Sequence, residues 1–154
     1  MAITPNTNFT AGAILTATQQ NNFPRGVMAL TPNSTTNTGI TTAQSIQITA
    51  SAFIAVAGRN YRVTYYEPSL QASVTAGYVL QIKNGGTVLN EMRLYGSTLG
   101  YSVGGTCTYV GTFTAGSVTL TASIATTIGT ATATRSASAP VTTAYVLVED
   151  IGTA

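Results

Sequence analysis

The stretch from Phe53 to Glu67 limits the possible folds more than any other part of the chain. Apolar and polar residues alternate up to Gly58, and a second alternation begins just beyond it. Successive side chains of a strand point to opposite faces, so Tyr61 and Tyr65 share one face and are expected in the core. The pattern predicts two neighbouring strands joined by a tight corner at residues 58–60, with the arginine at position 59 as a corner residue.

The same period-two alternation recurs in short segments separated by Gly, Pro or Asn. The expected strands are 27–31, 44–56, 60–66, 78–83, 87–95, 106–114, 117–125, 130–135 and 144–151. Regular spacing of this kind is typical of β-sandwiches and barrels. We therefore predict an all-β, antiparallel β-sandwich of about eight or nine strands, with the apolar segment 144–151 as a central strand.

Two turn signals lie in the middle of the chain. Asn84-Gly85-Gly86 predicts a hairpin between strands 78–83 and 87–95. We expect the inner face of its second strand to carry Val88, Met92 and Leu94. Pro68 cannot donate a hydrogen bond to a sheet, so residues 67–73 are expected to leave the sheet.

Residues 1–26 read as a segment apart from the β-domain, which is assigned to residues 27–154. Residues 1–13 have no periodicity and predict an extended arm. Thr16 and Gln19 then have the spacing of a capping box, which starts a helix by satisfying its first N–H groups. A helix of two turns is marginal alone, so it must be held by docking on this domain or on a partner. The apolar residues available for docking are Phe9, Ile14, Leu15 and Phe23.

The chain of 154 residues suits one domain, and only 6% of its residues are charged, against about 25% in an average protein. A surface this poor in charge does not resist self-association, so we expect it to be partly covered in an assembly. The six basic residues are scattered, which disfavours nucleic-acid binding. The start of the chain lacks the features of a signal peptide, and no apolar run reaches the ~18 residues of a membrane span. We expect synthesis in the cytoplasm, without export by the general secretory route, and no membrane insertion.

Catalytic residues are scarce. The chain has no His, which removes the commonest general base and metal ligand. Its acids are Glu67, Glu91, Glu149 and Asp150. Strand alternation sends the last two to opposite faces, and we expect Glu149 to pair with Arg62 or Arg135. Cys107 is the only cysteine, expected as a small core residue. We predict no catalytic site, no metal site and no cofactor.

Two stretches resemble a known family. The segment TPNTNFTAGAILTATQQNNFPRGV (4–27) is similar to a short N-terminal motif of many tailed-phage virion proteins. The matching residues are Phe9, Gly12, Leu15, Thr16, Ala17, Asn21 and Asn22. The segment AVAGRNYRVTYYEPSL (55–70) and the closing YVLVEDIG (145–152) resemble the jelly-roll domains, similar to the C1q and tumour-necrosis-factor fold, of phage minor tail, fibre and head-decoration proteins.

The resemblance implies a jelly roll and a non-enzymatic component of the virion surface, commonly a homotrimer. Its arm would dock on capsid or tail proteins through the four apolar residues named above. The alternative is a carbohydrate-binding module that recognises a host surface glycan through Tyr95 and Tyr101, which flank a Gly-containing loop. An enzyme is the third and least favoured class, because His is missing and acids are few.

Overall fold

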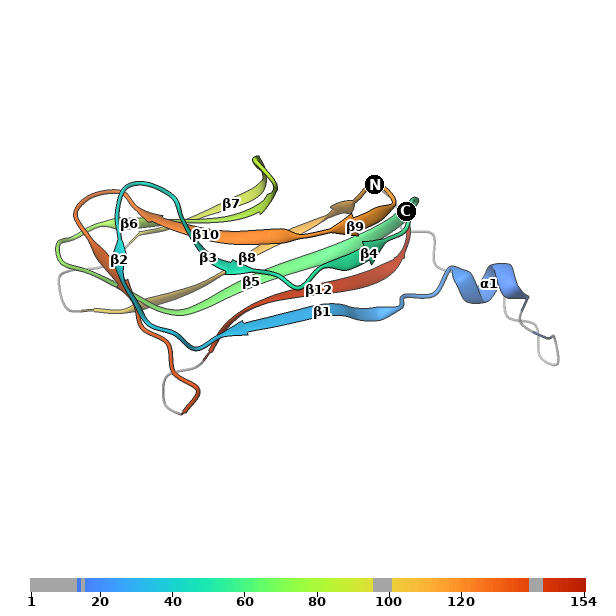
Figure 1. Ribbon diagram of the computed structural model, residues 1–154, viewed down its shortest axis with the longest axis horizontal. Coiled ribbons are helices and arrows are strands. Elements are labelled where there is room, and N and C mark those ends of the chain that lie inside the picture. The colour runs from blue at the N-terminus through green and yellow to red at the C-terminus, as the bar shows by residue number, and fades with distance from the viewer. Residues whose placement is uncertain (1–13, 15, 96–100, 139–142) are drawn as a thin grey trace.

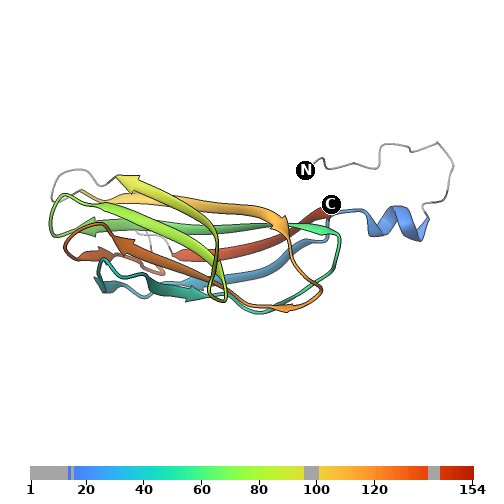
Figure 2. The same cartoon turned by 90° about the horizontal axis from the view of Figure 1, so that it is seen from above.

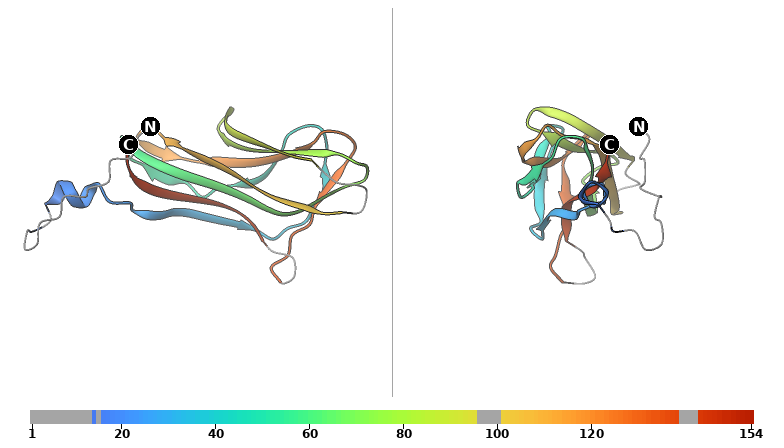
Figure 3. Two further views of the ribbon diagram at one scale, coloured as in Figure 1. Left: turned by 180° about the vertical axis from the view of Figure 1, so that it is seen from behind. Right: turned by 90° about the vertical axis from the view of Figure 1, so that its right-hand side faces the viewer.

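The computed structural model describes residues 14, 16–95, 101–138 and 143–154. Within these residues the chain forms twelve strands and one short helix, α1 (Ala17–Asn21). The long strands run along the long axis of the molecule and form two layers (Figures 1 and 3). Every strand pair is antiparallel. The all-β sandwich predicted from the alternation is confirmed.

The larger layer, sheet A, is built around the longest strand of the molecule. Its strand order begins β1 (Gly26–Asn33), β12 (Ala144–Thr153), β5 (Arg59–Ala72) and continues to β11 (Ala131–Ala133) and β2 (Asn37–Ile40). The other edge of β5 pairs with β8 (Val103–Thr112). As predicted, β12 is a central strand, because β1 and β5 lie on its two sides.

The second layer, sheet B, has the order β3 (Ser45–Thr49), β10 (Leu120–Thr126), β6 (Gly77–Asn84), β7 (Thr87–Tyr95). A short pair continues its first two strands toward one end of the sandwich. This pair is β4 (Phe53–Ala55), which follows β3, and β9 (Gly116–Val118), which precedes β10. Counting each of these continuations with its parent strand leaves ten strands in the described residues, eight long ones and the short strands β2 and β11.

The eight long strands pair in a nested order. The first pairs with the last (β1 with β12), the second with the seventh (β3 with β10), the third with the sixth (β5 with β8), and the fourth with the fifth (β6 with β7). This is the order of one long hairpin rolled into two facing sheets. The sandwich is therefore a jelly roll.

Apolar side chains from the facing sides of the two sheets form the core. Tyr61, Val63 and Tyr65 of β5 are fully buried against Leu80 and Ile82 of β6. Cys107 is also buried, and burial raises the pKa of its thiol to about 11. The tyrosines predicted for the core and the cysteine predicted as a core residue are thus found there.

The predicted pairing within Phe53–Glu67 is wrong. β4 pairs with β9, in the short pair that continues sheet B, whereas β5 belongs to sheet A. The turn through Gly58, whose φ is +74°, carries the chain from one layer to the other. Alternation marks both segments as strands, but it is identical for two strands that pair and for two strands that face each other across a core.

Two smaller predictions also need correction. Residues 67–72 do not leave the sheet, because β5 continues to Ala72 and absorbs Pro68 in a register shift between Glu67 and Leu70. The hairpin at Gly85-Gly86 is confirmed. A second register shift, however, turns Val88 outward, where it is 45% exposed, and Leu89 packs on the core in its place.

Candidate functional site

The segment between α1 and β1 meets the sandwich at one end. α1 lies beyond that end, next to where β12 finishes, with the sandwich extending away on the other side (Figures 1 and 2). The helix has the predicted capping box: the Gln19 N–H donates to the Thr16 hydroxyl, and the Gln19 side chain accepts from the Thr16 N–H at 2.9 Å. We call residues 21–25 the base of the arm.

A buried arginine holds the base of the arm. The guanidinium of Arg59 donates to both carboxylate oxygens of Asp150, at 2.7 Å from Nη2 to Oδ1 and through Nε to Oδ2. It also donates to two arm carbonyls, from Nη1 to the oxygen of Asn21 at 2.5 Å and from Nη2 to that of Phe23 at 2.6 Å. Arg59 is only 3% exposed and Asp150 only 1%. The prediction that Arg59 is simply a corner residue is therefore wrong, and we call this group of contacts the arm clasp.

Backbone groups as well as Arg59 stabilise the carboxylate of Asp150. Besides Arg59, it accepts a hydrogen bond from the backbone N–H of Gly152 at 3.0 Å, and the backbone of Arg25 in the arm also favours its charged form. Burial opposes ionisation of this carboxyl, but the hydrogen bonds and charge of Arg59 and the backbone donors outweigh it. The pKa of Asp150 therefore lies below its usual value.

A glycine lies at the end of β12, next to the base of the arm. Gly152 has φ of +116°, a conformation that other residues rarely adopt. A Cβ at this position would lie 3.5 Å from the carbonyl oxygen of Asn22 and 3.9 Å from Pro24, which are ordinary contact distances. The backbone conformation at Gly152, rather than the space beside it, therefore favours glycine.

Sequence reasoning missed both charged members of the clasp, although a signal for them exists. Alternation along β5 places Arg59 on the same face as Tyr61 and Val63, and alternation along β12 places Asp150 on the face of Val148. Both charges are thus directed inward, where each needs a partner. That the two meet depends on β5 and β12 being neighbours in register, which alternation does not reveal.

The apolar residues predicted to dock the arm are only partly described. Ile14 is 92% exposed and Phe23 is 37% exposed, so neither is buried against the sandwich. Phe9 and Leu15 lie outside the described residues. Of the two alternatives for holding α1, docking on this domain or on a partner, the exposure of Ile14 goes against the first.

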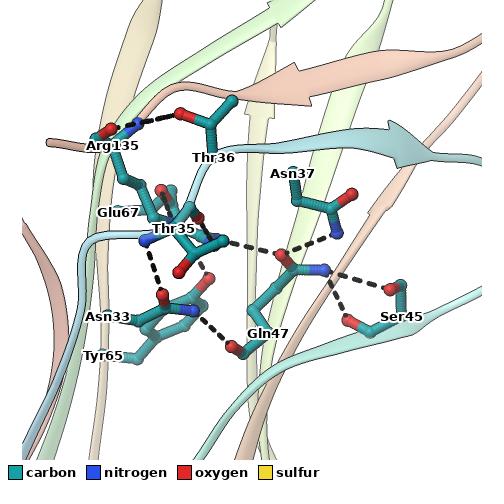
Figure 4. A network of polar contacts seen from close by, with 9 residues as sticks. All are labelled: Asn33, Thr35, Thr36, Asn37, Ser45, Gln47, Tyr65, Glu67 and Arg135. Carbon is teal, nitrogen blue, oxygen red and sulfur yellow. Dashed lines mark hydrogen bonds and ion pairs between the residues drawn. The ribbon is translucent and has the colours of Figure 1, made fainter.

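A second buried ion pair lies farther along β5, eight residues and roughly 26 Å from the clasp. Arg135, just beyond β11, donates to both carboxylate oxygens of Glu67, at 2.9 Å and 2.6 Å. It also donates to the Thr35 carbonyl and the Gln47 side chain, each at 3.0 Å, and Tyr65 donates to Glu67 at 2.7 Å. Figure 4 shows how these groups converge from both sheets and from the segment between β1 and β2.

The side chains of this network are not accessible to a substrate. Glu67 and Tyr65 are 0% exposed, and each Glu67 oxygen is already engaged by Arg135. Burial and the neighbouring Glu67 raise the pKa of Tyr65 well above its usual value, so the phenol keeps the proton that it donates. The group fastens sheet A to β3 of sheet B. Of the two partners predicted for Glu149, Arg135 is thus engaged elsewhere.

The remaining acids are paired near the surface. Glu149 pairs with Arg62 at 2.8 Å, as predicted, and Glu91 pairs with Arg93 at 2.8 Å. Together with the two buried pairs, all four acids of the chain contact an arginine. Among the described residues, no group of three or more acid, Cys or His side chains is placed to hold a metal ion.

The tyrosines of the alternative glycan surface are exposed. Tyr95, the last residue of β7, is 88% exposed, and Tyr101, just before β8, is 68% exposed. Residues 96–100, which connect them, lie outside the described residues.

Comparisons with protein families and with curated proteins identify no relative of this chain. No protein-family model matches the chain, and no curated protein matches it significantly. None of the described helical residues forms a helix long and apolar enough to cross a membrane.

Proposed function

We propose that this protein is a non-enzymatic structural component of a bacteriophage virion, either a head-decoration protein or a minor tail or fibre protein. It is a homotrimeric jelly roll attached to the particle by its N-terminal arm. The observation that carries the proposal is the state of the arm: its base is clasped to the sandwich, while Ile14 beyond the clasp is 92% exposed.

An exposed apolar residue just before a short helix indicates a docking element. A helix of five residues is too short to be stable alone, yet α1 is formed and has a complete capping box. Burying the Ile14 side chain against a partner would contribute about 1.5–3 kcal/mol. The resemblance of residues 4–27 to virion proteins suggests that the partner is a capsid or tail protein.

The outer face of sheet A supports self-association. We define this face by its apolar and aromatic residues: Val27, Leu30, Tyr66, Val110, Tyr145 and Leu147. Val27, Leu30 and Val110 are each more than half exposed, and the rings of Tyr66 and Tyr145 lie 5.3 Å apart. The ion pair on this face, Arg62 with Glu149, is internally neutral. An apolar face without net charge is suited to packing against a second copy of the same chain.

The paired acids support a structural role. General acid–base catalysis needs a carboxyl or imidazole that can exchange a proton with a substrate. This chain has no His, and each of its four carboxylates already contacts an arginine.

The arm is tested by particle incorporation. A chain lacking residues 2–20 keeps the base of the arm and should assemble into trimers that no longer join the particle. Ile14→Asp should lower particle occupancy at least about tenfold, because it places a charge in an apolar contact. Ile128→Asp is the matched control, since Ile128 is 56% exposed and lies in the loop after β10. Normal incorporation of the truncated chain would exclude arm docking.

A second candidate function follows from the two exposed tyrosines. Tyr95 and Tyr101 would stack on the sugar rings of a host glycan. A glycan array probed with the purified protein should then show binding that Tyr95→Ala with Tyr101→Ala abolishes. An array without any bound glycan would rule this candidate out.

A further inference from the structure

We infer that Arg59 and Asp150 are positioning residues, which fix the direction in which the N-terminal arm leaves the sandwich. The inference rests on the proposed function only in taking the arm as the docking element. The clasp itself is a property of the isolated protein and is measurable without a particle.

The contacts fix orientation as well as position. Arg59 donates to carbonyls two residues apart in the arm, those of Asn21 and Phe23. A planar guanidinium presents its donors in a rigid fork, so two contacts set the path of the backbone between them. Asp150 in turn engages the same guanidinium through both of its oxygens, which fixes the plane of the fork. The base of the arm is therefore held at two backbone carbonyls, just before β1 begins.

Stability of the sandwich alone does not explain such a pair. Burying two charges is costly, and well-packed apolar residues often serve a core equally well or better. Apolar residues, however, offer no donors to the carbonyls of the arm. The neighbouring pair Arg62–Glu149 shows the contrast, because it joins the same two strands on the outer face and its hydrogen bond runs from one partner to the other. The buried pair, unlike this one, also supplies hydrogen bonds to the arm.

The test is hydrogen exchange in the purified full-length protein. The double variant Arg59→Met with Asp150→Asn removes both charges, keeps an unbranched side chain at position 59 and the shape of the side chain at position 150, and leaves an amide oxygen for the Gly152 N–H. We expect the backbone amides of residues 22, 23, 25 and 26 to exchange at least about tenfold faster than in the wild type. The matched control, Arg62→Met with Glu149→Gln, should leave exchange in this segment unchanged.

The thermal midpoint Tm distinguishes positioning from general support. If the double variant had a lower Tm while residues 22–26 exchanged as in the wild type, the pair would only support the sandwich, and the inference would be wrong. Should that variant not fold, Arg59→Lys replaces it: an ammonium still faces Asp150 but lacks the fork for both carbonyls. Wild-type exchange at residues 22–26 in Arg59→Lys would equally overturn the inference.

The two proposals fail in different ways. If the arm does not dock, the chain lacking residues 2–20 joins particles normally, whatever the clasp does. If the clasp does not position the arm, the purified clasp variants retain wild-type exchange at residues 22–26, whatever the particle does. When both hold, the clasp variant should bind particles with a larger Kd but the same maximum occupancy.

Discussion

At the level of single residues, two buried arginines make the polar contacts that join distant segments of the chain. Arg59 and Arg135 are both buried, and each joins a carboxylate to backbone carbonyls that are distant in sequence. Lysine has no planar fork and could not make these contacts together. In a chain with so few charges, two arginines thus connect segments that apolar packing alone would leave separate.

The ion pair in the clasp predicts a specific dependence of stability on pH. The pKa of Asp150 is lower in the folded protein than in the unfolded chain, so its stabilising effect is fully present above the unfolded value of about 3.9. It is lost as the pH falls through the folded pKa. The wild type should therefore exceed Asp150→Asn in Tm near pH 6, and the difference should shrink near pH 3.

The control for this prediction is Glu149→Gln. Its pair with Arg62 is partly exposed, and exposed pairs contribute only about 0–1 kcal/mol. It should therefore differ little from the wild type at either pH, as measured by circular dichroism melts. A constant difference between wild type and Asp150→Asn across this range would show that ionisation of Asp150 does not stabilise the fold.

A glycine beside the register shift of β5 gives a second prediction. A Cβ on Gly104 would lie 2.6 Å from the carbonyl oxygen of Pro68, so backbone would have to move. We expect Gly104→Ala to lower the free energy of unfolding by about 1–3 kcal/mol in urea titrations. Gly86→Ala is the control, because a Cβ there meets no atom within 4 Å. Equal stability of the two variants would contradict the close contact of β8 with this part of β5.

At the scale of elements, the sequence predicts strands better than it predicts their partners. Alternation locates β5, β6 and β12, and Gly85-Gly86 identifies the hairpin, because these signals are local. Whether β4 pairs with β5 depends on the turn at Gly58, and glycine permits a crossing between sheets as readily as a hairpin. Pro68 is tolerated within β5 because the register shift removes the need for its missing N–H.

The candidate site likewise has a part that the sequence predicts and a part that it does not. The capping box of Thr16 and Gln19 and the apolar Ile14 are predictable, since they involve residues close in sequence. The clasp joins residues 91 positions apart and reaches 36 and 38 residues back into the arm. It exists only because the nested strand order brings β12 beside β5, so no local pattern contains it.

At the scale of the whole molecule, the proposed trimer predicts a difference between two similar substitutions. Val110→Lys places a charge on the outer face of sheet A, where Val110 is 55% exposed. Val88→Lys does the same on β7 of sheet B, where Val88 is 45% exposed. We expect only Val110→Lys to shift the mass from trimer toward monomer, by light scattering at micromolar concentration, because a buried unpaired charge is costly. A monomeric wild type would refute the trimer, and equal effects of the two variants would refute this face as its contact.

The clasp also determines where tension enters the molecule. A protein tethered by one end is pulled through that end, and β1, the first strand beyond the arm, is an edge strand whose partner among the described strands is β12. Force applied there would peel β1 away one hydrogen bond at a time. The clasp lies upstream of β1 and ties the arm to β5 and β12, two inner strands of sheet A. Force on the arm is therefore transmitted through the clasp to β5 and β12, which have neighbours on both sides, before it acts on the edge strand β1.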